Sequence, residues 1–279
     1  MTAPSLWRHG ALVASDYWRL RRVCGGRIAT RWLFAVAGTL DSCRREGSLG
    51  PADRAMGTGP FPVQLRGARA TLRGAGAFSG IREIWARDGY LGGGFLSIGP
   101  ADFVVDLGAN IGNFTNLALA HGPDVQVVAV EPGLVHNEIF RASVGANGWL
   151  DRTRLLRWVV GESPESMAWL FADPQFAGAA VVSPRELLAA LGDRPIDFLK
   201  CDIEGAEFLL MREADDVLER SKQIAMEIQD DSGERRTILD ALDRSGFETM
   251  FTADVAGSCV VLARKRAGIA SSTARAARP

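Results

Sequence analysis

The chain has 279 residues, of which 47% are hydrophobic and 23% are charged, so it can bury a full core as one domain with appendages. Its formal charge of −1 gives no overall attraction to nucleic acid or to an anionic membrane, and no apolar run approaches the ~20 residues of a membrane span. This composition predicts a cytoplasmic protein with a small-molecule partner, no nucleic acid and no membrane. Its four scattered cysteines are expected to be thiols, with one disulfide pair as the alternative.

Residues 1–50 predict a helical extension, because apolar residues alternate there with arginines as in amphipathic helices. We expect these helices to cover an edge of the core or to form a homodimer contact, with binding to a membrane surface as the alternative. Residues 51–80 are rich in Gly, Pro and Arg and predict a linker with short strands at Pro62–Leu65 and Ala70–Leu72. A main domain at 81–266 and a disordered tail at 267–279 complete the predicted organisation.

Two apolar runs in the main domain each end at a carboxylate. The run Phe103–Leu107 contains Asp106 and is followed by Gly108 and Gly112, which lack a Cβ and let the backbone pass close to a ligand at a helix N-terminus. The next run ends at Glu131. Together they predict a βαβ unit with both acids at the carboxyl ends of adjacent parallel strands, where open α/β sheets bind ligands. The alternative is that the acids are ordinary helix N-caps.

The turn residues indicate which ligand binds there. A dinucleotide fingerprint requires glycine at the third and sixth turn positions, which are Asn110 and Asn113 here. S-adenosylmethionine fits better, because its sulfonium and ammonium favour nearby carboxylates. In this interpretation Asp106 faces the methionine end, directly or through water, and Glu131 accepts hydrogen bonds from the ribose hydroxyls. The residues assigned to the cofactor are Asp106, Gly108, Ala109, Asn110, Gly112, Asn113, Thr115, Glu131, Pro132, Val160, Gly161 and Asp202.

A third run, from Ile196 to Glu207, combines an apolar strand with charged side chains. Lys200, Asp202 and Glu204 occupy alternate positions near the strand end, so their side chains would point to the same side. A purely structural core strand would avoid such a group of charges. Such clusters usually mark chemistry. A structural ion-pair network is the alternative interpretation.

These segments together resemble the FkbM family of S-adenosylmethionine-dependent methyltransferases, from about Ile81 to Arg264. The resemblance rests on Val105–Gly112, Val130–Pro132 and Asp197–Glu207, with looser support from Ala225–Gln229 and Ser245–Phe247. The family's fifth strand commonly ends Glu-x-His, whereas Gln229 stands at the histidine position here. The resemblance implies an α/β fold of the class I methyltransferase, Rossmann-like type: a seven-stranded, mostly parallel sheet with helices on both faces and a reversed last strand.

The remaining pattern agrees with that fold, because strand-like runs alternate with helix-compatible segments and the last two strands have no helix between them. The predicted strands are Phe103–Leu107, Val125–Val130, Arg154–Val160, Phe198–Cys201, Gln223–Ile228, Phe247–Thr252 and Ser258–Ala263. The predicted helices are Ile111–Ala120, Asn137–Ala146, Pro184–Leu191, Glu207–Arg212 and Arg235–Arg244.

The expected activity is O-methylation of a hydroxyl on a sugar or secondary metabolite. An alcohol loses its proton as the new bond forms, so a nearby carboxylate helps as general base. Asp202 is the first candidate, Glu204 is the second, Glu227 would orient the substrate and Lys200 would pair with a carboxylate. We predict no metal; a divalent ion on Asp202, Glu204 and Glu227 is the alternative for catechol-like acceptors.

Two other functions stay open at this point. A nicotinamide-dependent oxidoreductase is disfavoured by Asn110 and Asn113. A non-catalytic module that keeps the cofactor pocket is suggested by Gln229, where the family's histidine is missing.

Overall fold

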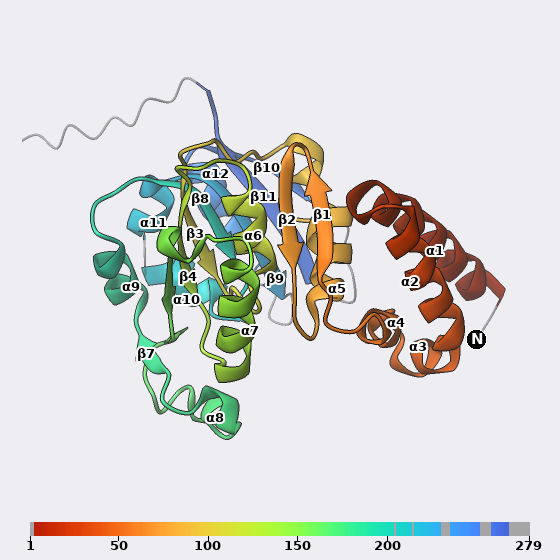
Figure 1. Cartoon of the computed structure of the whole chain (residues 1–279). Coiled ribbons are helices and arrows are strands. Elements are labelled where there is room, and N and C mark those ends of the chain that lie inside the picture. Colours follow the sequence, from red (N-terminus) through yellow and green to blue (C-terminus); the bar gives the residue numbers. More distant parts are fainter. Residues whose placement is uncertain (1–2, 204, 214, 230–234, 252–257, 268–279) are drawn as a thin grey trace, which may run out of the picture.

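A seven-stranded sheet forms the centre of the molecule, in the order β10-β11-β9-β8-β3-β4-β5 (Figure 1). The structure is a computed structural model, and it describes residues 3–203, 205–213, 215–229, 235–251 and 258–267. The strands are β3 (Phe103–Leu107), β4 (Gln126–Val130), β5 (Thr153–Leu156), β8 (Ile196–Cys201), β9 (Ser221–Gln229), β10 (Phe247–Phe251) and β11 (Ser258–Lys265). The predicted disordered tail at 267–279 lies almost entirely outside the described residues.

The strand directions confirm the predicted topology. β3 runs parallel to β4 and β8, β5 is parallel to β4, and β9 is parallel to β8. β11 lies between β9 and β10 and is antiparallel to both. The sheet is therefore mostly parallel with a reversed last strand, as expected.

Helices cover both faces of this sheet (Figure 1). α6 (Asn113–Leu119) and α7 (Leu134–Gly145) pack on one face with Val104 and Phe198. α9 (Pro184–Leu191), α10 (Glu207–Glu213), α11 (Asp215–Arg220) and α12 (Arg235–Arg244) lie on the other, with Val105 and Leu199. Neighbouring strand residues alternate between the two cores because successive side chains of a strand point to opposite faces.

The predicted strand Arg154–Val160 is wrong in its extent, because the structure divides it at Arg157. β5 ends at Leu156, while β6 (Trp158–Val160) pairs in parallel with β7 (Ala180–Val182) in a separate small sheet. The Arg157 guanidinium donates to the carbonyl oxygens of Pro132 and Ala177, outside the main ladder. The short segments near this division are η3 (Leu150–Arg152), α8 (Ala168–Phe171) and η4 (Pro174–Phe176).

The N-terminal segment forms a helical layer and a hairpin beside the sheet. The hairpin of β1 (Phe61–Leu65) and β2 (Ala68–Leu72) lies between this layer and α6 and α7 (Figure 1). The other elements are α1 (Ala3–Cys24), α2 (Gly26–Gly38), α3 (Leu40–Glu46), α4 (Gly50–Ala55), α5 (Ala77–Gly80), the π-helix η1 (Ile81–Ala86) and η2 (Gly92–Gly94). Side chains of these elements belong to the same buried cluster as Val104 of the sheet.

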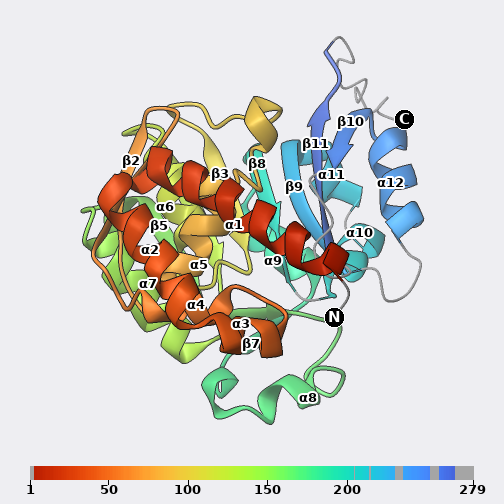
Figure 2. The ribbon, with the colours of Figure 1, turned by 90° about the vertical axis from the view of Figure 1, so that its right-hand side faces the viewer.

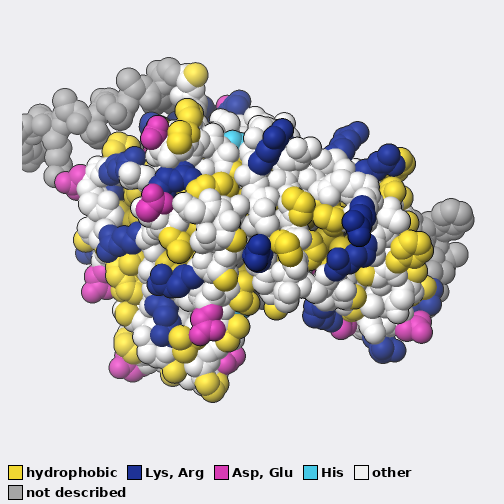
Figure 3. Space-filling model, viewed as in Figure 1, with side chains coloured by type: hydrophobic (Ala, Val, Ile, Leu, Met, Phe, Trp, Pro, Cys, Tyr) yellow, Lys and Arg dark blue, Asp and Glu magenta, His cyan; other side chains and the backbone are white. Residues whose placement is uncertain are grey.

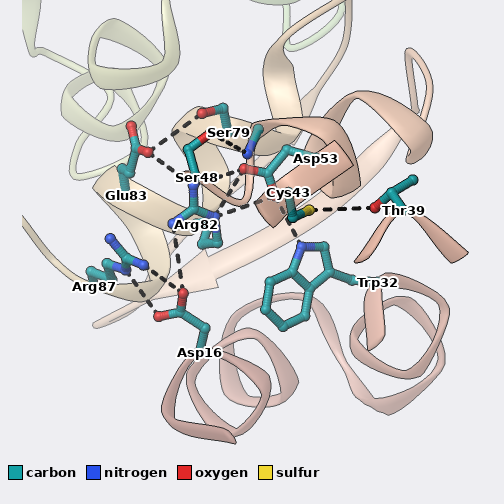
Figure 4. Close-up of polar contacts among 11 residues, drawn as sticks. Asp16, Trp32, Thr39, Cys43, Ser48, Asp53, Ser79, Arg82, Glu83 and Arg87 are labelled. Carbon is teal, nitrogen blue, oxygen red and sulfur yellow. Dashed lines mark hydrogen bonds and ion pairs between the residues drawn. The ribbon is translucent and has the colours of Figure 1, made fainter. Parts of the chain in front are cut away.

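A buried ion-pair network holds the helical layer in place (Figure 4). Arg82 donates from Nε and Nη2 to Oδ2 of Asp53 at 2.9 and 2.8 Å, and Trp32 donates from Nε1 to Oδ1 at 2.9 Å. Arg87 donates to both oxygens of Asp16, at 2.9 and 2.6 Å. The network therefore joins α1, α2, α4 and η1, and the carboxylates are buried but paired, as buried charges must be.

Candidate active site

A cavity of about 580 Å³ opens at the carboxyl ends of β3, β4 and β8. One wall consists of Gly108 and Asn110 from the turn after β3, Glu131 after β4 and Asp202 after β8. The opposite wall is largely apolar and comes from β6, the segment of α8 and η4, and α10; it includes Trp158, Met167, Trp169, Leu170, Phe176, Phe208 and Leu209. The cavity thus combines a polar edge with an apolar wall, as small-molecule sites usually do.

Asp106 and Lys200 face each other beneath this edge. They are register partners on the parallel strands β3 and β8, and Nζ of Lys200 lies 3.4 Å from Oδ1 of Asp106. Thr115 donates to Oδ2 of Asp106 at 2.6 Å. Burial raises the pKa of Asp106, and the charge of Lys200 works against that rise. Asp106 and Thr115 are both fully buried and lie outside the cavity wall.

Lys200 is fixed as a cation. Its Nζ donates to the carbonyl oxygens of Leu107 and Gly108, at 3.1 and 2.6 Å. Burial acts to lower the pKa of Lys200, but Asp202 and Asp106 outweigh it, and the pKa lies above its ordinary value. A protonated amine with these acceptors cannot take a proton from a substrate, which agrees with the predicted pairing role.

Asp202 reaches the cavity and is held by one hydrogen bond and one ion pair. The hydroxyl of Tyr90 donates to Oδ2 at 3.0 Å, and Nζ of Lys200 lies 3.5 Å from the same oxygen. Burial, and then the charge of Asp202, raise the pKa of Tyr90 well above its ordinary value, so the hydroxyl stays a donor. The side chain of Asp202 is 27% exposed.

Sequence reasoning missed Tyr90. It lies in the irregular segment between η1 and β3, outside every motif, and contacts Phe114 edge-on at a centroid distance of 5.6 Å. Its only sequence signal is a phenol among apolar residues, which does not distinguish a site residue from an ordinary core tyrosine.

Glu131 both shapes the turn and borders the cavity. Its Oε2 accepts from the backbone N–H of Asn110 at 2.9 Å, and its Oε1 accepts from that of Gly133 at 2.8 Å. Nδ1 of His136 lies 3.1 Å from Oε1, and this hydrogen bond to Glu131 raises the pKa of His136. The carboxylate thus stabilises the turn after β3, where Asn110 adopts a positive φ of 49°.

The glycines of this turn are also required by the protein's own packing. Gly108 has a φ of 71°, and a Cβ placed there would lie 1.7 Å from the carbonyl oxygen of Asp202. A Cβ on Gly112 would lie 2.8 Å from the ring of Phe140. The close approach is to the protein's own backbone and core, and it brings the turns after β3 and β8 together.

The loop after β8 is held by Glu207. Its Oε1 accepts from the N–H of Ile203 at 2.8 Å, and its Oε2 accepts from that of Gly205 at 2.7 Å. Glu204, the second candidate base, lies outside the described residues. Glu227 on β9 is not among the residues that line the cavity, but its charge contributes to the raised pKa of Tyr90. In the part of the chain that the structure describes, no cluster of three or more His, Cys, Asp or Glu could hold a metal ion.

The structure therefore brings part of the predicted site together around the cavity. Six predicted residues line the cavity: Gly108, Asn110, Glu131, Pro132, Val160 and Asp202. The other described candidates are not among the lining residues: Asp106, Ala109, Gly112, Asn113, Thr115, Gly161, Lys200 and Glu227. Their assignment to the cofactor or to catalysis remains a prediction.

The sheet order, the single reversed strand and an acid-bordered cavity at the strand ends define a class I methyltransferase with a Rossmann-like fold. The model of the methyltransferase FkbM domain matches residues 106–249, more than half of the chain. The protein belongs to the FkbM family, and it is an S-adenosylmethionine-dependent methyltransferase. The cavity suits this cofactor, since it offers a carboxylate at the polar edge and apolar side chains opposite.

Several solved methyltransferase structures are similar to part of this chain at low identity. The methyltransferase FkbM of Methylobacillus flagellatus is 17% identical over 62% of this chain and 46% of its own, with a TM-score of 0.48. The precorrin-6y C5,15-methyltransferase of Geobacter metallireducens is 14% identical over 61% of this chain and 84% of its own, with a TM-score of 0.40. Aeropyrum pernix fibrillarin, bound to S-adenosyl-L-methionine, is 14% identical over 60% and 68%, with a TM-score of 0.38.

A search of curated proteins found no match to this chain. Among the described helices, none is both long and apolar enough to span a bilayer.

Proposed function

We propose that this methyltransferase acts on a hydroxyl group of a sugar or secondary metabolite, with Asp202 as general base. The observation that carries the proposal is the Asp202 carboxylate, which lies on the cavity wall and accepts a hydrogen bond from Tyr90. An alcohol is a weak nucleophile until its proton leaves, so a carboxylate in reach of the acceptor serves this chemistry.

The residues around the cavity suggest how the cofactor would be held. Glu131 and Asn110 would contact the ribose, while Val160 and Trp158 would border the adenine. When bound, the cofactor supplies an electrophilic methyl group on a sulfonium. The protein's part is to position the acceptor beside it, and positioning alone can contribute an effective molarity on the order of 10⁵ M or more.

The hydrogen bond from Tyr90 and the ion pair with Lys200 support an orienting role for these two neighbours of Asp202. Among the described contacts of this carboxylate, Tyr90 and Lys200 both address Oδ2. We propose that Oδ1 accepts the proton of the substrate hydroxyl. Glu227 is proposed to orient the substrate, and Glu204 remains the second candidate for the base.

The activity is tested by incubating the purified protein with a labelled methyl donor and extracts of the producing cell. A compound that gains one methyl group on oxygen, identified by mass and by its fragmentation, supports the proposal. Methyl transfer only to carbon or nitrogen would overturn the O-methylation assignment while leaving the family membership intact.

The base is tested with Asp202→Asn, for which turnover should fall by on the order of 10²-fold or more while cofactor affinity is kept. Glu162→Gln is the matched control, because Glu162 also lines the cavity but follows β6 and pairs with Arg212. Unchanged turnover of Asp202→Asn at saturating substrate would rule out the assignment.

The ribose contact is tested with Glu131→Ala, which should weaken cofactor binding by ~1.5–3 kcal/mol, the usual range for a hydrogen bond to a charged group. Glu131 also holds Asn110, so the variant's melting temperature is measured alongside. An unaltered affinity would reject the ribose role.

A second candidate function is a cofactor-binding module without catalysis, because Gln229 stands where the family commonly has histidine. Cofactor binding by calorimetry, without methyl transfer to any hydroxylated acceptor, would favour it. Membership of a methyltransferase family weighs against the nicotinamide-dependent alternative.

A further inference from the structure

The helical layer exposes large apolar side chains. Ten such side chains are strongly exposed among the described residues, and half of them fall between residues 12 and 40. Phe34 is 74% exposed and Trp18 is 58% exposed; the others are Leu12, Leu33 and Leu40. Single exposed apolar residues are ordinary, but a concentration in one short segment marks an interaction surface.

On α1, the exposed aromatic residue lies among arginines. Trp18, Arg21 and Arg22 have helical spacing and are exposed, while Leu20 and Val23 are buried on the opposite stripe. The guanidinium of Arg21 lies 5.3 Å from the centroid of the Trp18 ring. The outward stripe of α1 is therefore aromatic and cationic.

α2 repeats this arrangement. Arg27, Arg31 and Phe34 follow one another at helical spacing and are exposed, while Trp32 and Val36 are buried. α1 and α2 lie side by side on the outer side of the molecule that Figure 2 presents. The two stripes belong to this one outer layer, which we call the α1–α2 face.

The charge of this segment is opposite to that of the rest of the chain. Residues 1–46 contain eight arginines and three acidic residues, although the whole chain has a formal charge of −1. Each of the three acids pairs with an arginine, two of them outside the segment: Asp16 with Arg87, Asp41 with Arg44 and Glu46 with Arg54. Figure 3 shows Lys and Arg side chains next to hydrophobic ones over the helical layer.

We propose that the α1–α2 face is a docking surface for a lipid bilayer with anionic headgroups. Trp and Phe rings insert at the boundary between headgroups and acyl chains, and arginines bind lipid phosphates. Because the positive charges lie on this segment, the face attracts anionic lipid although the net charge of the whole chain is close to zero. Self-association through the same face would bring the arginines of two copies together, which disfavours a symmetric dimer there.

The buried network explains how the face can act as a unit. Asp53 and Arg82 fix α2 and α4 to η1, and Asp16 with Arg87 fixes α1. The helices are thus held on the core with their apolar stripes inward and their aromatic and cationic stripes outward. The membrane-surface alternative left open by the sequence is the one that this arrangement favours.

The experiment is co-sedimentation of the full chain with vesicles of phosphatidylcholine alone or with about 30% phosphatidylglycerol, at about 0.1 M and about 0.5 M NaCl. We expect binding to the anionic vesicles only, and its loss at the higher salt. Two variants should bind the anionic vesicles more weakly. The aromatic variant combines Trp18→Ser and Phe34→Ser, and the arginine variant combines Arg21→Gln, Arg22→Gln and Arg27→Gln. The affinity of the arginine variant for these vesicles should fall on the order of 100-fold. Phe251→Ser, an exposed apolar residue on β10, is the control that should bind like the original protein.

Three results would overturn the proposal. The first is equal binding to neutral and anionic vesicles, and the second is unchanged vesicle binding of both variants. The third is a protein that does not bind vesicles but forms a dimer in light scattering, which the Trp18 and Phe34 substitutions dissociate. Melting temperatures of the variants are compared first, and the arginine variant keeps the test decisive if the aromatic variant fails to fold. Methyl transfer in the absence of vesicles is not expected to change in any of them.

Discussion

The hydroxyl of Tyr90 and Oδ2 of Asp202 lie 3.0 Å apart, although 112 positions separate the two residues in the chain. This hydrogen bond joins the segment before β3 to the turn after β8. Lys200 approaches the same oxygen from β8 at 3.5 Å. Asp202 is therefore oriented by a hydrogen bond from Tyr90 and an ion pair with Lys200, which suits a group that must accept a proton from a substrate.

Tyr90→Phe tests whether this contact positions the carboxylate. The turnover number should fall by about 10-fold or more, since a hydrogen bond to a charged group contributes ~1.5–3 kcal/mol, while the KM for the cofactor stays unchanged. Tyr17→Phe on α1 is the matched control, because Tyr17 and Tyr90 are the two tyrosines of the chain. Equal turnover in the two variants would remove Tyr90 from the mechanism.

Lys200→Met should destabilise the fold by about 3–5 kcal/mol in urea unfolding, because it leaves buried Asp106 without its cation. Lys222→Met removes a mostly exposed partner of Asp197 and should cost less than about 1 kcal/mol. Adding Asp106→Asn to Lys200→Met should recover part of the loss. Similar costs for the two single variants would contradict the buried pair.

Gly108→Ala should destabilise the protein by more than about 4 kcal/mol, because steric conflict with the Asp202 carbonyl adds to backbone strain. Gly148→Ala is the control, since Gly148 has a φ of 73° but nothing within 4 Å of an added Cβ. It should cost only the ~1–2 kcal/mol of a left-handed residue. Chemical denaturation of both variants separates clash from strain.

Asp53→Ala should release the helical layer. It removes the acceptor of both Arg82 and Trp32, and leaving a buried charge short of its partner costs about 3 kcal/mol. Limited trypsin digestion should then cut within residues 19–45 faster than in the original protein. Asp41→Ala, which breaks an exposed pair with Arg44, should leave both stability and digestion unchanged.

His136 should make stability depend on pH. Because Glu131 raises the pKa of His136 in the folded state, the pair stabilises the fold below the unfolded value of about 6.5, and this contribution is lost as pH rises through the folded value. His136→Ala should therefore lower the melting temperature at about pH 5.5 but hardly at about pH 9. His121→Ala should shift it in the opposite sense at acidic pH, because burial lowers the pKa of His121.

Local patterns predicted the alternation of strands and helices and which strand ends border the cavity, while the resemblance to the FkbM family implied the seven-stranded sheet with its reversed last strand. The strand Phe103–Leu107 agrees with its prediction residue for residue, and Asp202 and Glu131 reach the cavity as expected. These features depend on the alternation of side chains along a strand and on which residue follows the strand. Both are determined by residues that are neighbours in the sequence. Lys200 and Asp202 are two positions apart, so the sequence alone predicts that their side chains point to the same side of the strand.

Tertiary structure alone decided the rest. Tyr90 reaches Asp202 only because the segment before β3 packs over the end of β8, and Asp106 is buried because Lys200 stands beside it in the register of β3 and β8. Arg157 divides a continuous apolar run because its guanidinium finds the carbonyl oxygens of Pro132 and Ala177. The physical reason is common to all three: whether a side chain is buried, and which group it contacts, depends on residues distant in the chain that only the folded packing brings together.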